Sequence, residues 1–337
     1  MTDNLYTLEK ELPDVKVERP HVVLLGAGAS YAAFPEGDRN GIRLPVMANF
    51  VDTLGLKEDL VNAGINGPFN DFEALYSDIH IQQPDFARKL EEKIYNYFSQ
   101  LQLPDSPTIY DYLILSLREK DVIATFNWDP LLPQAAVRIS SLNLGIRMPE
   151  ILFLHGNVGM KHCPNCKSQF PLVLPCCPGC RTHKGERFKL LYPIKKKNYS
   201  ASSAIERQWG RLEEKLKQAL FVSIFGYGAP ISDIDAINQL KQAWGEKEDR
   251  NLEQYELIDI AEREEVEKRW EQFIHTHHSE YVTDFFDSRI ARHPRRSCES
   301  MVAQFFMNLW QDETSRPPMF ATVNELADWM YERISYE

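Results

Sequence analysis

Five short apolar runs, separated by stretches with helical periodicity, set the strongest limit on how this chain folds. The runs span residues 21–25, 122–126, 151–154, 220–225 and 255–260. A short apolar run that ends in turn residues is typical of a buried strand. Apolar strands that alternate with helices form a parallel sheet with helices on both faces. The sequence therefore predicts an α/β fold built on a Rossmann-like parallel sheet.

Other segments are arranged around the predicted sheet. Residues 1–18 are a polar lead-in, and residues 19–260 hold the sheet domain. Within that domain, residues 45–118 form an inserted helical module and residues 160–183 a small cysteine-rich lobe. Residues 261–337 are expected to be a helical C-terminal region.

The C-terminal region carries two apolar stripes at helical spacing. One consists of Val266, Trp270, Phe273 and His277, and the other of Val323, Leu326, Met330 and Ile334. The stripes either cover the sheet of the same chain or pack on another chain.

The charge balance excludes some classes of partner. The chain has 38 basic and 49 acidic side chains, which gives a formal net charge of −11. A whole-surface role on nucleic acid or on an anionic membrane is not expected, because both polyanions would be repelled. The N-terminus has no signal-peptide pattern, and no apolar stretch approaches the roughly 20 residues of a membrane helix. We therefore expect a cytoplasmic protein.

Polar and glycine residues follow the apolar runs at the positions where the strands end. Gly26-Ala27-Gly28-Ala29-Ser30 follows the first run, Asn127 and Asp129 the second, and His155 the third. The fourth run leads into Gly226-Tyr227-Gly228-Ala229-Pro230 and Asp233. Ligands of open parallel sheets bind outside the carboxyl ends of the strands. These residues therefore predict one ligand site.

Each of these residues also has an ordinary structural explanation. The glycine turn lacks the third glycine of the dinucleotide fingerprint, because position 31 is Tyr31, so a tight turn explains it as well as pyrophosphate binding does. His155 is either a general base or a buried core histidine. Asn127 and Asp129 either orient a ribose or a water, or form the turn in which Asp129 caps a helix that starts at Pro130.

Five of the six cysteines lie between Cys163 and Cys180, and only Cys298 stands apart. Two C-P-x-C knuckles place two thiolates each on a tight turn, and together Cys163, Cys166, Cys177 and Cys180 predict a structural zinc site. Cys176 is an alternative to Cys177, and His162 and His183 are less favoured ligands. A redox dithiol is the minor alternative.

Four further features have ordinary interpretations. His275, His277 and His278 are expected to be solvent exposed rather than to bind a metal. Lys195-Lys196-Lys197 is interpreted as a solvated loop, with anion contact as the alternative, and Arg295-Arg296 in the same way. Cys298 is expected to be a small buried hydrophobic residue.

Taken together and in order, these motifs resemble the SIR2-like (sirtuin-type) NAD-binding family. The glycine turn resembles its phosphate loop, Thr125-Phe126-Asn127-Trp128-Asp129 its T-x-N-x-D strand end, and His155-Gly156 its catalytic pair. The cysteine knuckles resemble its zinc module, and the segment from Gly226 to Asp233 the GYSxP-x-x-D motif of its bacterial branch. Leu257-Ile258-Asp259 resembles the strand that lies near the adenosine. The resemblance covers about residues 20–260.

Two departures from the family pattern concern the activity. The family's deacylases carry an FGE-type segment after the zinc module, whereas this chain has Arg187-Phe188-Lys189-Leu190-Leu191-Tyr192-Pro193. The early GIPxFR element is also altered, and Gly41-Ile42-Arg43-Leu44-Pro45 follows an insertion. Both departures resemble the bacterial members that hydrolyse NAD+ in antiviral defence.

The resemblance implies a NAD+ glycohydrolase that releases nicotinamide and ADP-ribose, with NAD+ as substrate and a structural Zn2+. It implies catalytic roles for His155, Asn127 and Asp129. The residues implied to bind the dinucleotide are Gly26, Ala27, Gly28, Ser30, Thr125, Asn127, Gly226, Tyr227, Asp233 and Asp259. Control by a homo-oligomer or by a co-encoded sensor protein is expected, with no direct contact to nucleic acid or membrane. NAD-dependent protein deacylation and a non-enzymatic NAD or ADP-ribose sensor or assembly subunit are the alternatives.

Overall fold

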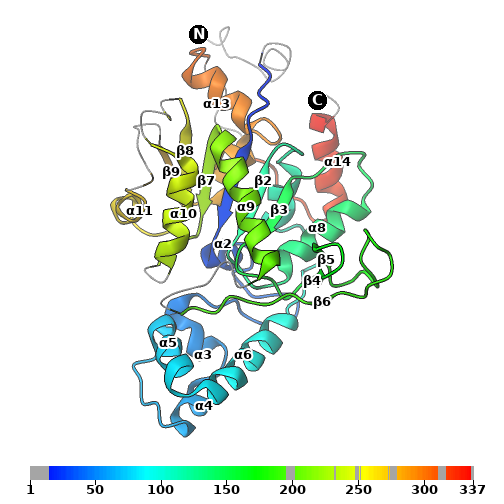
Figure 1. Cartoon of the computed structure of the whole chain (residues 1–337). Coiled ribbons are helices and arrows are strands. Elements are labelled where there is room, and N and C mark those ends of the chain that lie inside the picture. Colours follow the sequence, from blue (N-terminus) through cyan, green and yellow to red (C-terminus); the bar gives the residue numbers. More distant parts are fainter. Residues whose placement is uncertain are drawn as a thin grey trace.

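The computed structural model describes residues 15–194, 202–230, 233–246, 250, 252–271, 273, 279–309 and 316–334. Its centre is a six-stranded sheet in the order β3-β2-β1-β7-β8-β9, in which all neighbouring pairs are parallel (Figure 1). The strands are β1 (His21–Leu25), β2 (Val122–Thr125), β3 (Glu150–Phe153), β7 (Phe221–Phe225), β8 (Gln254–Ile258) and β9 (Ser279–Val282). The predicted α/β parallel sheet is confirmed.

The sixth strand lies in the C-terminal region that the sequence predicts to be helical. β9 pairs with β8 in parallel register, from Tyr255 opposite Ser279 to Ile258 opposite Val282. Its four residues are only half-buried, because it forms the edge of the sheet. A short edge strand needs few apolar side chains, so it lacks the pattern that marks a buried strand.

Helices cover both faces of the sheet, because alternate side chains of each strand point to opposite faces. Val22 and Leu24 of β1 pack with one layer of helices, and Val23 and Leu25 pack with the other. The first layer contains α9 (Ser203–Gln218), α10 (Ile234–Trp244) and α11 (Arg263–Arg269). The second contains α2 (Ala27–Ala33), α7 (Ile109–Leu115), α8 (Leu131–Ser141), η4 (Phe285–Asp287), α12 (Arg289–Arg292) and α14 (Val323–Ile334). α13 (Ser297–Phe305) packs separately against Leu220 and Phe221.

The two C-terminal stripes face the chain's own core. Val266, Trp270 and Phe273 are buried in the first layer, and Leu326 and Met330 in the second. The stripes therefore cover the sheet of the same chain, apart from His277, which lies outside the described residues.

A helical module lies below the carboxyl ends of the strands (Figure 1). It consists of η1 (Met47–Asn49), α3 (Phe50–Thr53), α4 (Lys57–Asn62), α5 (Phe72–Gln82) and α6 (Pro84–Ser99). Phe50 stacks on Phe72 within the module, with ring centroids 4.4 Å apart. Phe50 and Phe98 also meet Trp128 of the sheet domain edge to face, at 6.3 and 5.9 Å. This aromatic contact fixes the module beneath the sheet.

The cysteine-rich lobe is a small antiparallel sheet in the order β5-β4-β6. Its strands are β4 (Met160–Cys163), β5 (Ser168–Pro171) and β6 (Glu186–Arg187). After β6, residues 188–194 return along the sheet domain toward the helical module, where Ser77 Oγ donates to the Pro193 carbonyl oxygen at 3.3 Å. Residues 188–194, the return segment, therefore link the cysteine-rich lobe to the helical module.

Arg295 and Arg296 are not a solvated loop, so that interpretation is wrong. They are 3% and 7% exposed, and their guanidinium groups donate to backbone carbonyl oxygens, Arg295 to Leu117 at 3.0 Å and Arg296 to Val15 at 2.8 Å. A guanidinium with five donors can be buried wherever carbonyl oxygens converge, which local sequence does not reveal. Cys298 is buried, as predicted.

No helix in the described part of the chain combines the length and the apolar character that crossing a bilayer requires.

Candidate active site

The loops after β1 and β7 interlock through their glycines. Gly26 N–H donates to the Phe225 carbonyl oxygen at 3.0 Å, and Gly28 N–H donates to that of Gly226 at 2.9 Å. A Cβ on Gly28 would lie 2.8 Å from the Gly226 Cα, and one on Gly26 would lie 2.5 Å from the Gly226 oxygen. Only glycines permit this approach. The turn is therefore built for contact between two loops, and the N–H groups of Gly26 and Gly28 are used inside the protein.

Ser30, on α2, is the centre of a buried hydrogen-bond network. Its hydroxyl donates to Asp129 Oδ2 at 2.7 Å, lies 2.5 Å from the Tyr110 hydroxyl, and accepts from Asn127 Nδ2 at 2.9 Å. A hydroxyl has one donor and two acceptor positions, so these partners use its full capacity. Ser30, Tyr110 and Asp129 are 2%, 1% and 4% exposed. Ser30 therefore positions its neighbours.

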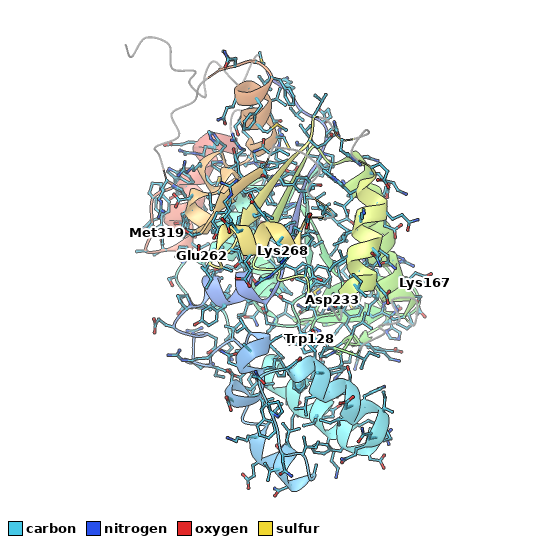
Figure 2. All side chains as sticks on the ribbon, turned by 90° about the vertical axis from the view of Figure 1, so that its left-hand side faces the viewer. Trp128, Lys167, Asp233, Glu262, Lys268 and Met319 are labelled. Atoms are coloured by element: carbon cyan, nitrogen blue, oxygen red, sulfur yellow. The ribbon has the colours of Figure 1, made fainter. Side chains whose placement is uncertain are left out.

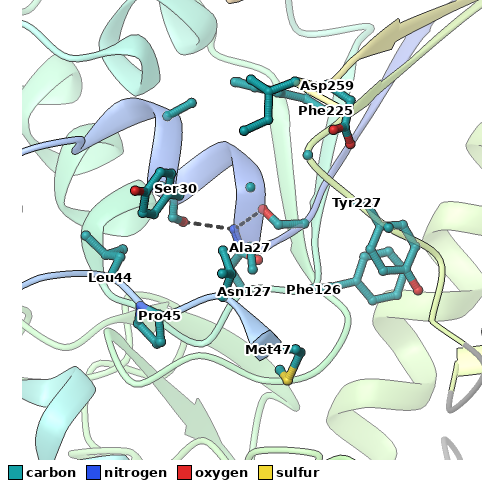
Figure 3. Close-up of a pocket in the computed structure, with 18 of the residues that line it drawn as sticks. Ala27, Ser30, Leu44, Pro45, Met47, Phe126, Asn127, Phe225, Tyr227 and Asp259 are labelled. Carbon is teal, nitrogen blue, oxygen red and sulfur yellow. Dashed lines mark hydrogen bonds between the residues drawn. The ribbon is translucent and has the colours of Figure 1, made fainter. Parts of the chain in front are cut away.

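Asn127 is fixed by this network (Figure 3). Its Nδ2 donates to the Gly26 carbonyl oxygen at 2.8 Å as well as to Ser30. Since a carbonyl oxygen only accepts, the amide nitrogen must face Gly26, which leaves Oδ1 for a ligand. Thr125 supports this loop from below, because its Oγ1 accepts from Asn127 N–H at 3.0 Å.

Asp129 does not cap a helix that starts at Pro130; the helix α8 starts at Leu131. Asp129 Oδ1 accepts from Leu131 N–H at 3.1 Å, and Oδ2 accepts from Ser30. Burial raises the pKa of this carboxyl above its ordinary value. The residue thus serves both the turn and the buried network.

His155 lies at the end of β3 and is 5% exposed. Its Nε2 is 3.9 Å from Asp233 Oδ1, and its ring meets Phe126 edge to face with centroids 4.9 Å apart. Asp233 Oδ2 accepts from the Tyr227 hydroxyl at 2.8 Å. Residues that follow β2, β3 and β7 thus gather with Asp233, which precedes α10, around one imidazole.

A cavity of about 1190 Å³ opens at the carboxyl ends of the strands, between the sheet and the helical module. Its wall includes most of the predicted site residues: Gly26, Ala27, Gly28, Ser30, Asn127, Asp129, His155, Gly226, Tyr227, Asp233 and Asp259. Thr125 is 1% exposed beneath Asn127 and does not line the wall. Trp128 and Asp233 lie where the sheet domain meets the helical module (Figure 2).

The far end of the cavity lies beside β8 and β9. Asp259 follows β8, and its Oδ1 accepts from Ala261 N–H at 2.9 Å. Phe285, Phe286 and Ile258 give this end an apolar wall. Arg269 also lines the cavity near Gly228, and its guanidinium is paired with the Glu265 carboxylate.

The four predicted zinc ligands converge. The sulfur atoms of Cys163, Cys166, Cys177 and Cys180 all lie within 4.8 Å of one another. Cys163 and Cys180 are 3.8 Å apart, close to the spacing of about 3.8 Å that zinc–sulfur bonds of about 2.3 Å give in a tetrahedron. The residues therefore fit a closed structural Zn2+ site. One cluster of four sulfurs also favours a metal over a redox dithiol.

Some site residues carry no recognisable sequence signal. Asn157 Nδ2 donates to the backbone oxygens of Asn127 and Asp129, at 3.2 and 2.6 Å, and so clamps the loop after β2. Tyr110 completes the Ser30 network from a helix that precedes the loop. A two-residue offset from His155 is the only sequence clue to Asn157, and Tyr110 offers none.

Two predictions fall outside the described residues. They concern Lys195-Lys196-Lys197 and the cluster His275, His277 and His278.

Comparisons with known proteins give structural similarities alone. No protein-family model and no curated protein matches the chain. Similar solved structures include Sir2 with a p53 peptide and NAD+, at 17% identity over 82% of this chain and 92% of that chain, with a TM-score of 0.39. A Sir2 homologue with ADP-ribose shows 15% identity over 98% of both chains and a TM-score of 0.40. Since these TM-scores lie below 0.5, the function proposed below rests on the residues of the cavity.

Proposed function

We propose that the chain is a SIR2-type NAD+ glycohydrolase. One observation carries the proposal: a single cavity at the strand ends gathers a buried histidine, an oriented asparagine and two interlocked glycine loops. At about 1190 Å³ the cavity also has room for a dinucleotide, since pockets for drug-sized ligands measure roughly 300–1,000 Å³.

The proposed orientation follows the chemistry of the wall. The adenosine lies at the apolar end near Phe285, with Asp259 accepting from its ribose hydroxyls. The pyrophosphate passes over the loop from Gly26 to Ser30, and Arg269 exchanges its partner Glu265 for the phosphate. The nicotinamide ribose then reaches Asn127 and His155.

Asn127 and His155 act at the bond that breaks. Loss of nicotinamide develops positive charge on the ribose ring, as in other glycosyl transfers. Asn127 Oδ1 accepts a hydrogen bond from the attacking water or from a ribose hydroxyl, and His155 takes the water's proton. Asp129 holds this arrangement through Ser30. The zinc site supports the lobe and takes no part in the reaction.

The return segment favours hydrolysis over deacylation. Leu191 N–H donates to the His155 carbonyl oxygen at 2.9 Å, and the Lys189 oxygen occupies the space that a side chain at Gly156 would need. The chain's own backbone thus covers the main chain of His155 and Gly156. A small acceptor such as water suits the site better than a peptide.

An assay of the purified protein with NAD+ tests the proposal. Nicotinamide and ADP-ribose are measured for the protein alone, with co-encoded neighbours, and with or without an acyl-lysine peptide. Hydrolysis predicts both products without peptide, and Asn127→Ala or His155→Ala abolishes them while the fold persists. Strict dependence on the peptide would support deacylation, and tight ADP-ribose binding without turnover in every mixture would support a sensor.

A NADase that is always active would exhaust the cell's NAD+. We therefore propose a cytoplasmic effector of antiviral defence, controlled by a homo-oligomer or a co-encoded partner. Because the C-terminal stripes are buried in this chain, that contact must use other surfaces.

A further inference from the structure

Asp233 is held on one side and turned toward His155 on the other. The Tyr227 hydroxyl donates to its Oδ2 at 2.8 Å, while its Oδ1 lies 3.9 Å from His155 Nε2. The Tyr227 ring stacks on Phe126 at 4.0 Å, and Phe126 in turn meets the edge of the His155 ring. The side chains of His155 and Asp233 are only 6% and 5% exposed. Carboxylate and imidazole therefore share one rigid, dry environment.

Helix capping does not explain Asp233. It occupies the cap position of α10, which starts at Ile234, but its side chain makes no capping hydrogen bond. Asp233 Oδ1 lies within ion-pair distance of His155 Nε2, beyond hydrogen-bond distance, and so occupies the side of the imidazole from which the acid of a catalytic triad orients its histidine.

We propose that Asp233 is a positioning residue for His155, rather than a ligand of the dinucleotide. It favours the tautomer with hydrogen on Nε2, which leaves the lone pair of Nδ1 to take a proton. This inference rests on the proposed NAD+ hydrolysis.

The step balances as follows. The water oxygen bonds to the ribose carbon, and the bond from that carbon to the nicotinamide nitrogen breaks, with its electron pair leaving on neutral nicotinamide. The water's proton passes to His155 Nδ1 and later to solvent. Asp233 stays ionised throughout and stabilises the imidazolium.

Two uncharged groups also contact His155. The Phe126 ring, which follows β2, meets the imidazole edge to face, and the Leu191 N–H of the return segment donates to the His155 carbonyl oxygen. The Lys189 side chain, on the return segment, is exposed. Asp233 brings a carboxylate to within 3.9 Å of the imidazole, so its removal should change the titration of His155.

Histidine 15N NMR without substrate tests the pair directly. His155→Gln identifies the signal, which is then followed against pH in the wild type, Asp233→Asn and Asp259→Asn. Asp259 lines the same cavity and serves as the matched carboxylate control. In Asp233→Asn we expect less of the Nε2–H tautomer and a titration midpoint at lower pH, because a carboxylate favours the imidazolium. An unchanged tautomer and midpoint would overturn the proposal.

Kinetics and binding separate positioning from dinucleotide binding. Asp233→Asn should lower kcat at least about 10-fold and leave the Kd for ADP-ribose within about 2-fold, whereas Asp259→Asn should weaken ADP-ribose binding. Weaker ADP-ribose binding in Asp233→Asn with unchanged kcat would assign Asp233 to the dinucleotide and overturn the proposal. If Asp233→Asn does not fold, Asp233→Ala, which also removes the carboxylate, replaces it with the same expected results. The NMR result stands even if the wild type fails to cleave NAD+, so the two proposals fail separately.

Discussion

The backbone N–H of Gly28 donates to the carbonyl oxygen of Gly226, and the two residues lie about 200 positions apart in the chain. This bond joins the ends of the two central strands, β1 and β7. At the floor of the cavity, the backbone of one loop therefore contacts the backbone of the other. This contact leaves no room for a side chain at position 28 or 226.

Gly28→Ala should destabilise the protein, because the added Cβ would lie 2.8 Å from the Gly226 Cα. We expect a loss of about 1–3 kcal/mol in the free energy of unfolding, measured in urea, and loss of ADP-ribose binding. Gly210→Ala is the control: Gly210 is an exposed residue of α9 with no atom near its Cβ position, and alanine there should stabilise by about 0.5–1 kcal/mol. Equal effects of both changes would contradict this account of the loops.

The sequence predicts which residues form the site better than it predicts which residues they contact. Gly26, Asn127 and His155 follow apolar runs, and strand ends meet at one edge of a parallel sheet, so their convergence was predictable. The hydrogen bond from Gly28 to Gly226 was not predictable, because the pairing of two distant loops leaves no local sequence pattern. Ser30 illustrates the same limit: its motif position is recognisable, but Tyr110, which completes its network, lies on a separate helix.

Ser30→Ala should weaken the hydrogen-bond network that positions Asn127, although the Ser30 hydroxyl itself does not bind the ligand. It removes the donor to Asp129, the partner of Tyr110 and one of the two anchors of Asn127. We expect a loss of about 1–3 kcal/mol in stability and about a 10-fold fall in NAD+ hydrolysis. Ser99→Ala, at an exposed hydroxyl on α6, should change neither by more than about 0.5 kcal/mol or 2-fold. Wild-type activity in Ser30→Ala would show that Asn127 needs no such support.

The cysteine centre predicts one zinc ion per chain. Cys177→Ser should lose the metal and lower the Tm, because Cys177 is a buried member of the four-sulfur cluster. Cys176→Ser should keep the metal, since Cys176 lies outside that cluster. Elemental analysis measures the zinc content of both variants. Retention of zinc in Cys177→Ser would show that another residue is the fourth zinc ligand.

A buried network that runs from the start of β1 to the middle of β7 and β8 predicts how stability depends on pH. His21 Nε2 lies 2.8 Å from the Ser223 hydroxyl, which donates to Glu256 Oε2 at 2.8 Å. Burial, with smaller effects of Lys120 and Arg289, holds the pKa of His21 well below its ordinary value of 6.5. Burial, aided by Glu280, raises the pKa of Glu256 from 4.5 to about 7.

The two groups act in opposite directions between about pH 4.5 and 6.5. Below pH 6.5 the unfolded chain protonates His21 and the folded chain does not, so this group destabilises the fold as pH falls. The folded chain keeps the Glu256 proton that the unfolded chain loses, so that group destabilises the fold as pH rises toward 7.

Urea unfolding at pH 5, 6 and 7 measures both slopes. Glu256→Gln should make stability rise more steeply with pH, and His21→Gln should make it rise less, each by up to about 1.4 kcal/mol per pH unit. Changes of the same sign in both variants would contradict the assignment.

The position of β7 in the chain has a consequence during synthesis. β1, β2 and β3 are complete when residue 153 has been made, but β7, which forms the other half of the cavity floor, ends at Phe225 and is followed by β8 and β9. Parallel pairing between distant strands forms late, because the intervening chain must be ordered first. A ribosome-bound fragment that ends before Phe225 therefore lacks one wall of the cavity, and under the proposed hydrolysis such a fragment cannot cleave NAD+.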